Sequence, residues 1–386
     1  MLKRGVLLIG FLSTFSLSLA QHHEAAAETK PATETKVVSA KEAEKEQIKK
    51  ENKEFIDHHL LDAHSFDIMV EKKADGTEHH IGFPLPVIFY DEANGLHAFM
   101  SSEFHHGKEM KDAHGKKYNV VESKGANYAL YHEKIVKTDA SGAITLDDHG
   151  HATNAKVLDL SITKSVLMIL CASLLMIVIF GSMARNYKKS PIPTGAGKLF
   201  EPLVIFIRDE IAIPNIGPKY HKYISYLLTI FFFILFLNVF GLLPFGINVT
   251  GNLAITAALA IFTFIITQFT ANRNYWQHIF WMPGLPFLMK LVMIPIELIG
   301  MIIKPFALLI RLFANMSAGH IVIFSLIAMI YYFQNVIAGV AFPFLTFVLY
   351  LLEILVAFLQ AYIFTMLSAV YFGMANEEHH HEEAHH

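Results

Sequence analysis

The sequence has little cysteine and little charge, and each shortage excludes a class of protein. The one cysteine among 386 residues, Cys171, excludes an internal disulfide and any metal cluster of cysteines. It lies in an apolar run, so we expect a small buried hydrophobic residue. Charged residues make up 17% of the chain, below the ~25% of soluble domains. No phosphate-binding loop of the GxxxxGKS or GxxxxGKT type occurs, so nucleotide chemistry would belong to other chains.

Apolar residues are abundant instead, and they gather in long runs. They make up 53% of the chain, which together with the low charge indicates a membrane protein. The runs predict an all-α polytopic core with five crossings, of which the last two are long, tilted and paired as a hairpin. The crossings are expected at about 164–183, 223–243, 252–270, 287–333 and 341–374. Residues 201–213 are too short and too charged to span, and they predict a helix in the membrane interface.

The fourth crossing is unusually long. At 1.5 Å per residue it far exceeds a hydrocarbon core of about 30 Å. It must therefore tilt, bend, or break near Pro295 or Pro305.

The ends of the chain predict its orientation. Residues 1–20 have a basic start, an apolar stretch and a small-residue cleavage site, and they predict a signal peptide, with an uncleaved anchor as the alternative. Cleavage would leave residues 21–159 exported. Basic residues in the loops 184–222 and 271–290 favour an inner location for those loops. We therefore expect five crossings between a periplasmic N-terminal region and a cytoplasmic tail, residues 377–386, which is rich in His and Glu.

The exported region, 21–159, is rich in histidine and predicts a small β-rich domain after a polar stretch at 24–54. Strand-like runs lie at 66–70, 86–90 and 118–121, and turn sequences include Asn94-Gly95 and Ser141-Gly142. Histidine pairs occur at His58-His59, His79-His80 and His105-His106. Metal binding is one interpretation of these pairs. Adjacent histidines point to opposite sides of a strand, however, so a solvated polar surface is favoured and no metal site is expected.

Arg311 stands inside the fourth crossing, where charge is otherwise avoided. An arginine at membrane depth costs roughly 2.5–3.5 kcal/mol on insertion scales, so it indicates a function and should face protein or water. Ala314, Asn315 and Ala318 share its helical face, which is therefore lined by small residues that permit the close approach of another helix. His320 is nine residues on, about half a turn away, and should serve a different surface.

The last crossing carries Thr346, Glu353 and Gln360 at intervals of seven residues, hence on one face two turns apart. A carboxylate and an amide on an apolar helix suggest a water-lined path. The alternative is a structurally paired glutamate, with His320 as its partner.

The run Arg311-Leu312-Phe313-Ala314-Asn315-Met316, followed by Ala318-Gly319, closely resembles subunit a of the F-type ATP synthase, the membrane stator beside the rotating c ring. Glu297, Lys304-Pro305 and Leu359-Gln360-Ala361 also stand at the spacing of that family. The resemblance covers about residues 161–378 and does not include the first 160.

The resemblance implies a proton-translocating subunit of a bacterial inner membrane that is not an enzyme by itself and needs no cofactor or metal. The partners that it implies are the c ring against the Arg311 face, the peripheral-stalk subunit b, the rest of the ATP synthase and membrane lipid, but no nucleic acid. Arg311 would separate two half-channels, each of which crosses half of the membrane.

The resemblance also implies which residues line the proton path. Asn315, His320, Glu353 and Gln360 match polar positions of the outer half-channel, and the order of the histidine and the glutamate is that of mitochondrial-type members. Further lining residues would be Asn238, Asn252 and Thr256, with Glu297 and Lys304 toward the inner half-channel.

Two interpretations from other classes stay open. One is a histidine-rich metal-ion transporter, in which Arg311 would repel the cation. The other is an exported sensory domain anchored by a membrane bundle, which leaves Arg311, Glu353 and Gln360 unexplained. Co-purification with a ring of small hairpin proteins distinguishes the stator from both.

Overall fold

The computed structural model describes residues 62–72, 78–112, 117–147, 152–190, 192–243, 248–281, 286–333 and 336–376. All of these belong to one unit, Asn52–His386. The expected signal peptide, the polar stretch at 24–54 and the tail at 377–386 lie outside the described residues.

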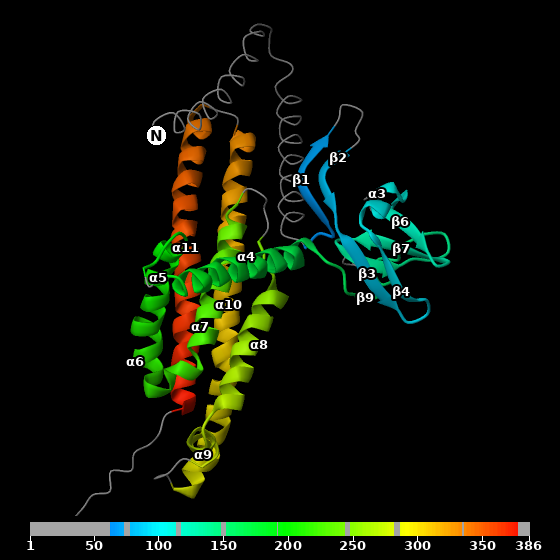
Figure 1. Ribbon diagram of the computed structural model, residues 1–386. Helices are drawn as coiled ribbons and strands as arrows, with labels where there is room; N and C mark the ends of the chain where they lie inside the picture. Colours follow the sequence, from blue (N-terminus) through cyan, green and yellow to red (C-terminus); the bar gives the residue numbers. More distant parts are fainter. Residues whose placement is uncertain are drawn as a thin grey trace, which may run out of the picture. The chain divides into compact units, whose positions relative to one another are not determined.

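The N-terminal part of this unit, residues 62–162, is a β domain (Figure 1). Its elements are β1 (Ser65–Lys72), β2 (Glu78–Pro84), β3 (Pro86–Asp91), β4 (Gly95–Met100), α3 (Ser102–His106), β5 (Lys108–Lys111), β6 (Lys117–Ser123), β7 (Ala126–Tyr131), β8 (Lys134–Lys137) and β9 (Leu158–Asp159). They form three antiparallel sheets, ordered β1-β2, β4-β3-β9 and β5-β6-β7-β8. The prediction of a small β-rich domain is confirmed.

Alternating apolar residues explain how the two larger sheets pack. Val87 and Phe89 of β3 are fully buried against Val121, Tyr128 and Ile135 of the other sheet. The rings of Phe89 and Tyr128 lie 4.7 Å apart. The predicted turn at Asn94-Gly95 joins β3 to β4, and Gly95 has a φ of +77°, which glycine adopts without strain.

The rest of the chain is helical. Its elements are α4 (Lys164–Tyr187), α5 (Gly197–Phe206), a π-helical turn η2 (Ile207–Ala212), α6 (Ile213–Ile216), a 3-10 turn η3 (Gly217–Lys222), α7 (Ile224–Gly241), α8 (Leu253–Thr270), α9 (Arg273–Phe280), α10 (Phe287–Phe333) and α11 (Val336–Asn376). In the described chain, α4, α7, α8, α10 and α11 are long and apolar enough to cross a membrane. The five-crossing prediction is confirmed. The predicted interfacial helix at 201–213 is part of a longer helical stretch, and α9 was not expected.

Two helices are far longer than a bilayer core. α10 has 47 residues and α11 has 41, hence about 70 Å and 60 Å at the usual rise per residue. Figure 1 shows them side by side, and they pack against each other. α10 is continuous through Pro295 and Pro305, so the break considered from the sequence does not occur. A tilt or a bend is what the length requires.

α7 is the most deeply packed of the crossings. Leu227, Phe231 and Ile234 are fully buried in the core of the bundle. α4, in contrast, leaves most of its apolar side chains exposed or only partly buried, and Cys171 is among the exposed residues. The expectation that Cys171 is buried was wrong, because a helix surrounded by lipid is as apolar in sequence as one surrounded by protein.

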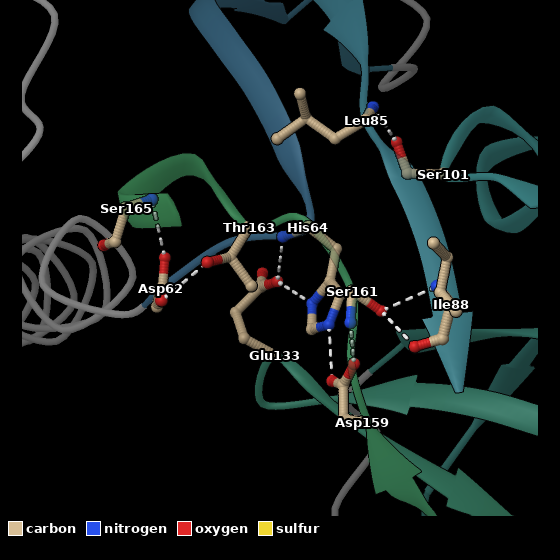
Figure 2. Close-up of polar contacts among 10 residues, drawn as sticks. All are labelled: Asp62, His64, Leu85, Ile88, Ser101, Glu133, Asp159, Ser161, Thr163 and Ser165. Carbon is tan, nitrogen blue, oxygen red and sulfur yellow. Dashed lines mark hydrogen bonds and ion pairs between the residues drawn. The ribbon is translucent and has the colours of Figure 1, made fainter. Parts of the chain in front are cut away.

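The β domain is hydrogen-bonded to the first turn of α4 (Figure 2). The Asp62 carboxylate accepts hydrogen bonds from the Thr163 hydroxyl at 2.9 Å and from the Ser165 amide at 3.1 Å. The Lys164 amide donates to the Ala63 carbonyl at 3.0 Å. Asp62 and Ala63, which precede β1, therefore pair two amides of the first turn of α4 that a helix start would otherwise leave unpaired.

Next to this cap, His64 lies between two carboxylates (Figure 2). Its Nε2 is 2.8 Å from Asp159 Oδ2, and its Nδ1 is 3.6 Å from Glu133 Oε2. Burial by itself lowers the pKa of His64, but the hydrogen bonds and charges of Asp159 and Glu133 outweigh burial and raise the pKa to about 9. The imidazolium form is thus the one that the folded domain stabilises at neutral pH.

Candidate functional site

α10 presents two different faces around its arginine. Arg311, Ala314, Asn315 and Ala318 are exposed. The opposite face, Leu308, Leu312, Met316 and His320, is buried against the bundle. The prediction that Arg311 and His320 serve different surfaces is confirmed, because nine residues turn a straight helix by about two and a half turns.

The Arg311 guanidinium has no hydrogen bond and no ion pair within the described part of the chain. The guanidinium charge interacts electrostatically with Tyr371 of α11. An exposed and unpaired arginine on a membrane helix is costly unless something outside the chain compensates its charge. The small side chains of Ala314 and Ala318 leave room for such a partner to approach.

On the buried side, α10 and α11 meet around a carboxylate. Glu353 of α11 packs so closely on Gly319 of α10 that a Cβ at residue 319 would collide with the Glu353 carboxylate. His320, the next residue, is 7% exposed, and its Nε2 has no hydrogen-bond partner among the described residues. The structure thus brings Glu353 to the helix turn that carries His320, without a hydrogen bond between the two.

The predicted polar stripe of α11 points into the same region. Gln360 is 3% exposed, Glu353 is half-buried, and the Thr346 hydroxyl is buried without a partner among the described residues. Ala357 lies between Glu353 and Gln360 and is buried, so this face of α11 packs on the protein. The stripe is therefore an internal polar line.

The segment between α7 and α8 fastens this region. Asn248 donates from its amide to the Met316 carbonyl of α10 at 3.2 Å and accepts from the Gly251 amide at 2.8 Å. Asn238, fully buried on α7, donates to the Ala357 carbonyl at 3.1 Å and accepts from the Thr250 hydroxyl at 2.9 Å. Asn248 and Thr250 were not singled out from the sequence, because no local pattern marks a contact that the fold creates.

The other predicted lining residues of this side make local contacts. Asn252 caps α8 by accepting from the Ala254 amide at 2.9 Å. The buried Thr256 hydroxyl donates to the Asn252 carbonyl at 3.2 Å, one turn back. Their role in a path stays a prediction.

A second polar region lies on the other side of Arg311 along α10. A cavity there is lined by Thr263, Thr267, Gln268, Tyr275, Lys304 and Tyr371, together with apolar residues. Lys304 Nζ lies 5.7 Å from the centre of the Tyr371 ring, and Gln268 Oε1 is buried without a partner among the described residues. Of this group the sequence indicated only Lys304. Glu297, seven residues earlier, is partly exposed on the same helix.

Comparison with known proteins agrees with this arrangement. A family model described as ATP synthase A chain matches residues 166–373, and a model described as a domain of unknown function, DUF8433, matches residues 55–160.

Several curated relatives are similar over long stretches. ATP synthase subunit a 2 of Chlorobaculum tepidum is 48% identical over 227 residues, which are 56% of this chain and 64% of that protein. ATP synthase subunit a of Chlorobium phaeobacteroides strain BS1 is 40% identical over 325 residues, 79% of this chain and 93% of that protein. ATP synthase subunit a of Myxococcus xanthus is 45% identical over 236 residues, 59% of this chain and 77% of that protein. The chain belongs to the ATP synthase A chain family.

Proposed function

We propose that this chain is the membrane stator of an F-type ATP synthase and that it carries protons to and from a rotating c ring. The observation that carries the proposal is the position of Arg311, which is exposed, unpaired within the described residues and placed between two polar regions. One region contains His320 and Glu353, and the other contains Lys304.

The spacing along α10 supports two separate half-channels. Lys304 precedes Arg311 by seven residues and His320 follows it by nine, about 10 Å and 14 Å along the helix axis. Neither separation is as long as a hydrocarbon core of about 30 Å. Protons would therefore cross by leaving one region, riding on the ring and entering the other.

The chemistry of Arg311 suits a barrier between the two regions. A guanidinium has a pKa above 12, so it cannot relay a proton, yet it attracts an ionised carboxylate. On the exposed face of α10 it would make an arriving ring carboxylate release its proton, and it would block a direct leak.

The His320 region suits proton delivery. An imidazole exchanges protons near neutral pH, and a carboxylate can pass them on. Glu353 and Gln360 continue the polar line along α11, while Asn315 lies one turn from Arg311 on the exposed face. We assign Glu297 and Lys304 to the opposite half-channel.

The finer assignments follow from this proposal. The c ring would lie against the Arg311 face, and subunit b would support the stator. ATP chemistry would belong to partner chains, so this chain would not be an enzyme by itself. The chain would lie in a bacterial inner membrane with the β domain in the periplasm and the C-terminus in the cytoplasm, as the basic residues of the loops 184–222 and 271–290 favour.

ATP-driven acidification of inverted membrane vesicles tests the proposal. We expect vesicles with the unchanged complex to acidify and vesicles with an assembled Arg311→Ala complex not to. Arg273→Ala, which changes an arginine of the short helix α9, is the matched control and should acidify normally. If the assembled Arg311→Ala complex acidified vesicles as fast as the control, the proposal would be wrong.

A further inference from the structure

The sheet β4-β3-β9 has one apolar face inside the β domain and a second apolar face outside it. The inner face contributes Val87 and Phe89 to the core. The outer sheet face consists of Tyr90, Leu96, Met100, Leu158 and Leu160, whose side chains are 42% to 62% exposed. An outward face of a solvated antiparallel sheet is usually polar, so this one calls for a covering.

The outer sheet face is continuous from strand to strand. Tyr90 pairs with Leu96 of β4 on one side and with Leu158 of β9 on the other. Met100 pairs with Pro86, and the Leu160 amide donates to the Ile88 carbonyl at 2.8 Å. The sheet β5-β6-β7-β8, in contrast, has apolar clusters on both of its faces.

The end of this sheet is attached to α4 without a flexible linker. Strand-like pairing continues past β9, because the Ile162 amide donates to the Pro86 carbonyl at 3.1 Å. The Ser161 hydroxyl contacts the backbone of Ile88 at 3.1 Å and 3.2 Å, and Asp62 caps α4 directly afterwards (Figure 2). The Leu160 end of the outer sheet face is therefore held close to the start of α4.

The length of α4 places that start near the membrane surface. Its 24 residues span about 36 Å, slightly more than a hydrocarbon core of about 30 Å. Leu160 precedes the first residue of α4 by four residues, hence by at most about 14 Å of extended chain. A headgroup layer about 5–7 Å deep lies within that reach.

We propose that the outer sheet face docks on the lipid surface at the N-terminal end of α4. Apolar side chains with an amphipathic tyrosine among them are what a membrane interface accommodates. The five side chains of this face are uncharged, so a charged protein surface would gain little from covering them. The proposal needs only that α4 spans the membrane and is independent of the proton path.

Site-specific fluorescence of the full-length chain in liposomes tests the proposal. A Cys171→Ser background removes the one native thiol, and Leu96→Cys or Leu158→Cys then carries a bimane label. Ser141→Cys is the control, because it is exposed at a turn on the far side of the sheet β5-β6-β7-β8, where the Tyr118 hydroxyl donates to the Gly142 carbonyl. Lipids with a nitroxide on the headgroup are expected to quench the labels at positions 96 and 158 at least about threefold more than the label at 141.

Quenching by aqueous iodide distinguishes a face covered by protein from a face exposed to water. If the labels at 96 and 158 were protected from iodide but were not quenched by nitroxide lipid, protein would cover this face and the proposal would be overturned. If iodide reached them as readily as it reaches position 141, the face would be uncovered and the proposal would again be overturned.

Discussion

His64 gives a prediction whose magnitude follows from the structure. The folded domain raises the pKa of His64 to about 9 from 6.5, through Asp159 and Glu133 and against the effect of burial. At about 1.36 kcal/mol for each unit of pKa difference, the raised pKa corresponds to about 3 kcal/mol of folding free energy. Because the pKa is raised on folding, the contribution is complete below pH 6.5 and is lost as the pH rises through about 9.

The perturbation is His64→Gln in the full-length chain, held in nanodiscs. Glutamine cannot become charged, so the variant lacks the stabilising imidazolium at every pH. Between pH 7 and pH 10 the unchanged domain should lose roughly 2.5 kcal/mol of unfolding free energy that the variant does not lose. Pulse proteolysis in urea at the two pH values measures this double difference.

His97 is the matched control. It is also buried in the β domain, where its Nδ1 lies 2.9 Å from the Ser123 hydroxyl. Burial, together with the charge of Lys124, lowers the pKa of His97, so its imidazole stays neutral over the same pH range. His97→Gln should therefore change stability equally at pH 7 and pH 10. If His64→Gln also changed the unfolding free energy equally at pH 7 and pH 10, the reasoning about the two carboxylates would be refuted.

Two further predictions concern the membrane core. Gly319→Ala should displace the Glu353 carboxylate and slow ATP-driven acidification roughly ten- to hundredfold, whereas Gly181→Ala on α4 meets open space and should leave the rate unchanged; equal rates in both assembled variants would contradict the assigned role of Glu353. Asn238→Leu should remove the hydrogen bond to the Ala357 carbonyl, leave the buried Thr250 hydroxyl without its acceptor, and lower the free energy of unfolding by about 1–3 kcal/mol, while Asn252→Ala, which loses one cap, should cost about 1 kcal/mol; the reverse order would show that Asn238 does not hold α7 to α11.

The sequence was most informative where a local pattern decides the structure. Long apolar runs predicted the five crossings, because a helix that lipid surrounds must be apolar on all sides. The two faces of α10 followed from the helical period, which separates Arg311 from His320. Short strand-like runs separated by turn sequences likewise predicted β1, β3 and β6 of the β domain.

Contacts between distant segments could not be predicted in this way. Asn238 meets Ala357 across 119 residues, and Glu353 meets Gly319 only because α10 and α11 pack in one register. The cavity around Gln268 is lined by residues of four helices, α8, α9, α10 and α11. The exposure of Cys171 could not be predicted either, because an apolar sequence neighbourhood does not distinguish a residue that faces lipid from one that faces protein.

The most direct test of the central claim compares two proton fluxes in the same vesicles with an assembled Arg311→Ala complex. One is ATP-driven pumping, and the other is passive flow down an imposed proton gradient after removal of the catalytic head. If Arg311 is the barrier between the two polar regions of α10, pumping should be lost while passive flow persists at or above the level of the unchanged complex. Pumping at the unchanged rate would contradict the account.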